Sequence, residues 1–120
     1  MRAVGVFEWV TDEALIDAVT ALSGSGPAYV FYFLEAMIEA GTQLGLSAEH
    51  SRRLAQQTFA GAAQLAKQST EALPLLRERV TSKGGTTLAA ITTLDNDRVK
   101  AAFVRAMLAA HARAVELGNS

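Results

Sequence analysis

Alanine is the commonest residue of this 120-residue chain, and proline occurs only twice. Alanine has the highest intrinsic helix propensity, whereas proline interrupts helices. Apolar residues also recur at helical spacing through most of the sequence. The sequence therefore predicts an all-α fold, a bundle of about five to six helices.

Helix boundaries are predicted from capping residues and turn residues. We expect helices over residues 13–22, 27–44, 48–68, 73–80, 86–94 and 98–117. The expected boundary residues are Thr11 or Asp12, Pro27, Ser47 and Pro74 at helix starts and Gly41, Gly45 and Gly118 at helix ends.

One short segment departs from the helical pattern. Residues 5–10 resemble one short β-strand, and a lone strand cannot form a sheet. Its partners would lie in sequence that is missing here. We therefore expect residues 1–11 to be the remnant of another domain and residues 12–120 to form the helical domain.

Composition limits the partners of the chain. Half of the residues are hydrophobic, which favours burial against a second chain in an obligate oligomer. The longest apolar run, residues 28–34, is far shorter than the roughly 20 residues that span a bilayer. The net charge is −1 and no basic tract occurs, so neither nucleic acid nor an acidic membrane is an expected partner.

Cysteine and histidine limit the chemistry. The chain has no cysteine, as suits a reducing cytoplasm. The apolar segment at the N-terminus is too short for a secretion signal. Since His50 and His111 lie far apart, their spacing predicts no metal site. Glu35 and Glu39, one helical turn apart, could hold a metal, although a solvated helix face explains them more simply.

A glycine pair supplies the main functional signal. Residues 80–87 read Val-Thr-Ser-Lys-Gly-Gly-Thr-Thr and precede a helical pattern. A glycine turn that leads into a helix leaves N–H groups unpaired at the positive end of the helix dipole, which suits a carboxylate or phosphate. The hydroxyls of Ser82, Thr86 and Thr87 could complete such a site. The alternative is an ordinary turn with threonine caps.

Two segments resemble a known family. Residues 18–31, followed by Glu35, Gly41 and Gly45, are similar to the helical C-terminal domain of pyrroline-5-carboxylate reductase. Residues 80–95 resemble the signature segment of that family, with matching spacing. The resemblance extends over essentially the whole chain.

The resemblance implies a fold, an activity and a partner. Members of the family are oxidoreductases that reduce 1-pyrroline-5-carboxylate to proline with NADPH or NADH, the last step of proline biosynthesis. Their Rossmann domain holds the cofactor, and their helical domain holds the substrate and forms the dimer. We therefore expect an intertwined homodimer or a higher oligomer of dimers, cytoplasmic and without a metal. Residues 5–10 would be the edge of an absent Rossmann sheet, and the chain alone would be inactive.

The resemblance also implies site residues. The substrate loop of the family falls on Val80, Ser82, Gly84, Gly85, Thr86 and Thr87, and Thr20 matches a threonine that lines the same pocket. In this interpretation, the amides of residues 85–87 bind the substrate carboxylate. Thr87 is the catalytic residue and hydrogen-bonds the ring nitrogen, chiefly to orient the imine.

One residue departs from the family pattern, and two other functions stay open. Lys83 stands where the family most often has proline, which frees the backbone and adds a positive charge near the carboxylate site. The chain could instead be a non-catalytic helical dimerisation module. It could also be the helical domain of a related dehydrogenase that acts on another small carboxylate.

Overall fold

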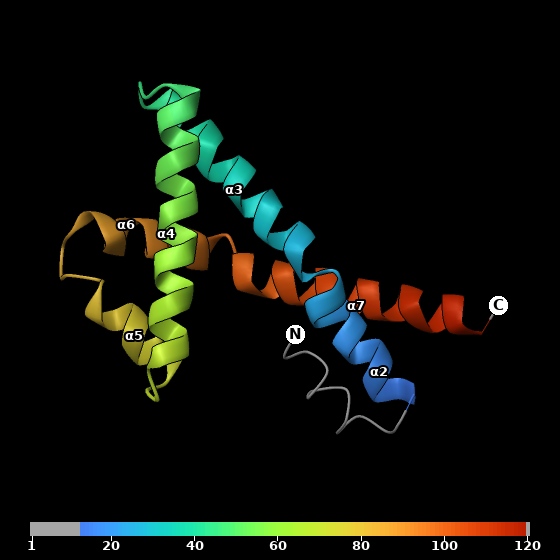
Figure 1. Ribbon diagram of the computed structural model, residues 1–120. Helices are drawn as coiled ribbons and strands as arrows, with labels where there is room; N and C mark the ends of the chain where they lie inside the picture. Colours follow the sequence, from blue (N-terminus) through green and yellow to red (C-terminus); the bar gives the residue numbers. More distant parts are fainter. Residues whose placement is uncertain (1–12, 120) are drawn as a thin grey trace. The chain divides into compact units, whose positions relative to one another are not determined.

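The computed structural model describes residues 13–119, and these residues are all-α, as the sequence predicts (Figure 1). The expected strand at residues 5–10, the expected cap at residues 11–12 and the boundary between the two expected domains lie outside the described residues. The elements in chain order are α2 (Glu13–Val19), the π-helical segment η1 (Thr20–Gly24), α3 (Gly26–Gln43), α4 (Ala48–Gln68), α5 (Leu73–Arg79), α6 (Thr86–Asn96) and α7 (Val99–Gly118).

The chain divides into two compact units. Within the described residues, the first unit comprises residues 13–30 and 98–119, and the second comprises Phe31–Asp97. The division passes through α3, so the first turn of this helix belongs to the first unit. The first unit also holds α2, η1 and α7, and the second holds α4, α5 and α6.

In the first unit, α7 lies against α2 and η1. The small side chain of Ala21 is buried there, at 5% exposure. The rings of Tyr29 and Phe103 meet edge to face, with their centroids 5.4 Å apart. Such an arrangement is favourable for aromatic pairs beyond the area that they bury.

The first helix differs from its predicted extent of residues 13–22, because α-helical geometry ends at Val19. The Ser25 N–H donates to the Thr20 carbonyl, five residues back, at 2.9 Å. In a regular α-helix it would donate to the Ala21 carbonyl. That carbonyl instead accepts the hydroxyl of Tyr29 at 2.7 Å. The tyrosine thereby satisfies the carbonyl that the π-helical turn leaves free.

In the second unit, the connection from α3 to α4 is fixed by local signals. Gly45 has a φ of +104°, and the Leu46 N–H donates to the Gly41 carbonyl at 3.0 Å. This pattern is a Schellman motif, in which glycine avoids the cost of a left-handed backbone. Ser47 then caps α4 by accepting the His50 N–H at 3.0 Å. The predicted helix end at Gly45 and the predicted cap at Ser47 are confirmed.

Two other predicted glycine boundaries are wrong. Gly41 lies inside α3 and is buried, because α4 approaches the helix there. Gly118 is the last residue of α7, and Asn119 is the cap residue. No positive φ is needed at Gly118, so glycine has no special role in ending this helix.

Two smaller differences concern helix ends. The α6 helix runs two residues beyond its predicted end at residue 94 and stops before Asp97. Arg98, predicted as the first residue of the last helix, precedes α7 with a left-handed φ of +55°. Arg79, at the end of α5, forms a two-pronged ion pair with Glu71 and remains exposed. The predicted start of α5 near Pro74 is confirmed.

Large apolar side chains remain accessible in both units. Within the described residues, only Ala21, Gly41, Ser51 and Ala55 are buried, and none of the large side chains is fully buried. Phe31 is 62% exposed and Tyr32 is 68% exposed. Extensive exposed apolar surface is typical of chains that bind a partner. Between residues 13 and 119, no helix is both long enough and apolar enough to cross a bilayer.

Candidate functional site

The predicted substrate loop is a tight turn between α5 and α6. The Gly85 N–H donates to the Ser82 carbonyl at 3.2 Å, and Gly84 has a φ of +66°. Lys83, at the second position of the turn, does not have a positive φ. These features define a type II turn, whose third position requires a positive φ and therefore favours glycine.

The two glycines are needed for different reasons. Gly84 adopts a left-handed backbone that most side chains disfavour. Gly85 has an extended backbone, but a Cβ atom there would lie 2.8 Å from the Ser82 hydroxyl oxygen and 3.3 Å from the Ser82 carbonyl oxygen. The pair therefore allows the turn to close directly onto the first residue of α6.

The start of α6 presents unpaired amides. Gly85 is the cap residue, and no side chain caps the helix. The first bond of the helix is donated by Ala89 to the Gly85 carbonyl at 3.2 Å. In the part of the chain that the structure describes, the N–H groups of Thr86, Thr87 and Leu88 have no hydrogen-bond acceptor. Three such groups at the positive end of a helix favour an anionic ligand. The predicted set of free amides, residues 85–87, is therefore wrong at Gly85, whose N–H is used by the turn.

The loop hydroxyls are also available. Thr87 is half-buried, and Ser82 and Thr86 are exposed. None of their hydroxyls makes a hydrogen bond within residues 13–119, whereas Thr81 and Thr93 donate to carbonyls four residues back. The threonine caps of the alternative interpretation are not formed, because neither Thr86 nor Thr87 caps α6.

The other predicted site residues are divided between the two units. Val80 follows α5 and is 67% exposed. Thr20 belongs to the first unit, where its hydroxyl donates to the Ile16 carbonyl at 3.0 Å. The structure thus brings together residues 80–87 within the second unit, and Thr20 lies in the other unit. Lys83 is exposed and has no ion pair among the described residues.

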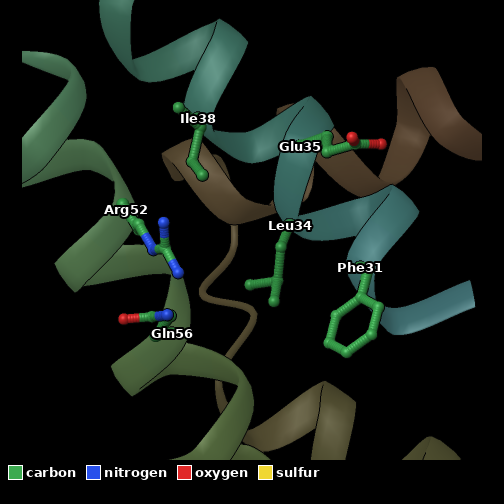
Figure 2. Close-up of a pocket in the computed structure, with 6 residues that line it drawn as sticks. All are labelled: Phe31, Leu34, Glu35, Ile38, Arg52 and Gln56. Carbon is green, nitrogen blue, oxygen red and sulfur yellow. The ribbon is translucent and has the colours of Figure 1, made fainter. Parts of the chain in front are cut away.

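A groove in the second unit was not predicted. Its volume is about 220 Å³, and it lies between α3 and α4 without touching residues 80–87. Figure 2 shows the side chains that line it, Phe31, Leu34, Glu35, Ile38, Arg52 and Gln56. The spacing of Phe31, Leu34 and Ile38 on one face of α3 was the available sequence signal, but the groove also requires α4.

Metal ligands do not gather in the described region. Within residues 13–119, no group of three or more His, Asp or Glu residues is arranged to hold a metal ion. Glu39, one of the two glutamates considered for this role, accepts a hydrogen bond from the Gln43 side chain at 3.4 Å.

The helical fold and its loop match a class of dimerisation domains. A family model described as pyrroline-5-carboxylate reductase dimerisation matches residues 13–117. The match covers nearly all of the described helices. This chain belongs to the pyrroline-5-carboxylate reductase dimerisation family.

Individual relatives agree with this assignment. The pyrroline-5-carboxylate reductase of Pseudomonas aeruginosa is 50% identical over 119 residues, which make up 99% of this chain and 44% of the relative. A solved structure of a pyrroline-5-carboxylate reductase from Coxiella burnetii has a TM-score of 0.87 at 46% identity, covering 91% of this chain and 40% of that chain. A Plasmodium falciparum pyrroline carboxylate reductase structure with NADP bound has a TM-score of 0.86 at 36% identity, covering 89% and 43%. The present chain therefore spans less than half the length of each of these relatives.

Proposed function

We propose that this chain is the substrate-binding and dimerising helical part of a pyrroline-5-carboxylate reductase. The complete enzyme would reduce 1-pyrroline-5-carboxylate to L-proline with NADPH or NADH, the last step of proline biosynthesis. The observation that carries the proposal is the set of unpaired amides of Thr86, Thr87 and Leu88 behind the Gly84–Gly85 turn. The family match and the relatives named above supply the reaction.

The substrate carboxylate would bind at the start of α6. Its oxygens would accept the free N–H groups, and the absence of a Cβ at Gly84 and Gly85 lets a ligand approach the backbone closely. Ser82, whose hydroxyl has no partner among the described residues, could donate a further hydrogen bond. Val80 would line the same loop, and the family resemblance also assigns Thr20 to substrate binding.

Thr87 would hold the imine nitrogen of the ring. A neutral hydroxyl is a poor acid, so its main contribution is orientation rather than proton transfer. Correct orientation of two reactants can lower a barrier by several kcal/mol without a strong acid or base. When bound, the nicotinamide cofactor supplies the hydride. The proposal accordingly needs no catalytic histidine and no metal.

The described residues do not by themselves provide the dinucleotide site. That site normally needs a glycine-rich turn between a strand and a helix. The structure has only helices and their connections between residues 13 and 119, and the glycines at 84 and 85 follow a helix. We propose that a Rossmann domain outside this chain holds the cofactor, so the cofactor-binding residues stay unassigned.

The exposed apolar faces support an intertwined homodimer or a higher oligomer of dimers. We also propose, from the family resemblance, that the protein acts in the cytoplasm. We expect the face of α3 to be buried against a second copy, since Phe31 and Tyr32 are largely exposed in the single chain. The face of α7 is expected to be buried in the same way, because Val104 and Leu108 are also exposed.

Thermal stability in the presence of small ligands tests the proposal on the dimeric chain. L-proline at millimolar concentration should raise the melting temperature, because a ligand that binds only the folded state stabilises it. Pyrrolidine, which has the ring without the carboxylate, should give no such shift. If neither compound stabilises the protein, the non-catalytic dimerisation module is favoured. If pyrrolidine acts as strongly as proline, the amides of α6 do not bind the carboxylate.

A further inference from the structure

The groove between α3 and α4 has no part in the proposed chemistry. Phe31, Leu34 and Ile38 make its apolar side, and Arg52 and Gln56 reach it from α4. Phe31 and its neighbour Tyr32 are largely exposed, so the apolar surface continues along α3 beyond the groove. A surface of this kind in a protein of a dimerisation family suggests an interface.

Two opposite charges at the groove remain unpaired within the chain. Neither Glu35 nor Arg52 forms an ion pair among residues 13–119, whereas the adjacent Arg53 pairs with Glu49 at 3.6 Å. Figure 2 shows the Arg52 guanidinium extending from α4 toward the groove, while the Glu35 carboxylate points away from α4. Among the described residues, Arg52 therefore places an unpaired cation at the groove, and Glu35 carries an unpaired anion on the side of α3 that is turned away from α4.

We propose that this groove is a contact surface for a second copy of this chain, in which Arg52 of each copy pairs with Glu35 of the other. A two-fold symmetric interface is self-complementary, since residue i meets residue j and residue j meets residue i. Because each copy carries one unpaired arginine and one unpaired glutamate on this surface, a two-fold dimer would form two equivalent ion pairs. The inference rests on the proposed homodimer and identifies the surface and the charges that set its register.

Charge reversal tests the pairing by sedimentation equilibrium of the chain. Arg52→Glu or Glu35→Arg alone should weaken dimerisation by about tenfold or more, because like charges then face each other across the interface. The double variant should return to within about threefold of the wild type. An equimolar mixture of the two single variants should also restore dimers, since both pairs in the mixed dimer are again opposite in sign.

Matched variants separate the pair from general effects of charge. Arg53→Glu changes the adjacent arginine, and Glu39→Arg changes the glutamate one turn along α3. Neither residue lines the groove, so both variants should change dimerisation by less than about threefold. Circular dichroism should show unchanged helix content in every variant, as expected for exposed side chains.

Each alternative result would overturn the inference in a different way. If the double variant recovers but the mixture does not, the two residues pair within one chain. If the wild type is dimeric and the single reversals have no effect, another occupant covers the groove. A monomeric wild type would refute the proposed homodimer itself, and the pairing with it.

Discussion

Gly41 of α3 and Ser51 of α4 are so close that a Cβ atom on Gly41 would lie 2.3 Å from the Ser51 hydroxyl oxygen and 2.8 Å from the Ser51 Cβ. Both residues are buried, and the serine hydroxyl has no hydrogen-bond partner among the described residues. Since they lie on either side of the short connection between the helices, their contact determines how closely α4 approaches α3.

Gly41→Ala should destabilise the protein by about 2 kcal/mol, the usual cost of overpacking. Rotation of the Ser51 side chain would move its oxygen but not its Cβ, so the backbones must separate. Denaturant unfolding at a fixed protein concentration measures the loss. Gly118→Ala is the control, because nothing lies within 4 Å of the added Cβ there. Equal stability of the two variants would show that α4 can move away from α3 without lowering the free energy of unfolding.

Ser51→Ala should stabilise the protein by about 1 kcal/mol, since it removes a buried hydroxyl that lacks a partner. The same unfolding measurement applies. Ser23→Ala, which removes an exposed hydroxyl that donates to the Val19 carbonyl at 3.1 Å, should change stability by less than about 0.5 kcal/mol. A loss of stability in Ser51→Ala would mean that the hydroxyl is hydrogen-bonded in the assembled protein.

Lys83→Pro should stabilise the loop by about 0.5–1 kcal/mol. The lysine occupies the second position of a type II turn, where proline fits, and its N–H makes no hydrogen bond within the described residues. Lys83→Gln removes the charge without stiffening the backbone and should leave stability unchanged. If both variants shift the melting temperature equally, the effect comes from charge and not from the turn.

Gly84→Ala should destabilise the protein by about 1–2 kcal/mol, because its φ of +66° brings a Cβ close to the following carbonyl oxygen. Gly84→Asn should cost less, since asparagine tolerates this conformation better. Thermal unfolding ranks the three proteins. An alanine variant as stable as the wild type would argue against the left-handed conformation.

The helices were predictable because their signals are local. Helical spacing of apolar residues, the Ser47 cap and the glycine at position 45 each act within a few residues of the boundary that they define. The π-helical segment was not predictable, because it depends on a hydrogen bond from Tyr29 to a carbonyl eight residues earlier. The packing role of Gly41 likewise depends on a residue of another helix.

Likewise, only some features of the candidate site could be predicted from the sequence. The proposal of an anion site at residues 84–87 follows from adjacent glycines before a helix, and the structure adds that the N–H groups of Thr86, Thr87 and Leu88 have no acceptor among the described residues. Threonine caps were equally compatible with the local sequence, and only the observed start of α6 excludes them. The groove at Arg52 is formed by residues of both α3 and α4, so it could not be predicted from any single segment of the sequence.

Thr87→Ala in the complete enzyme should lower kcat by about tenfold or more, because the imine nitrogen loses the hydroxyl that orients it. Thr87→Ser keeps the hydroxyl and should retain most of the turnover. Thr92→Ala removes an exposed threonine of the same helix and serves as the control. Steady-state oxidation of NADPH or NADH with 1-pyrroline-5-carboxylate gives kcat and KM, and circular dichroism checks folding. An unchanged kcat in a folded Thr87→Ala enzyme would remove Thr87 from the mechanism and leave the amides of α6 as the only substrate contacts proposed for this helix.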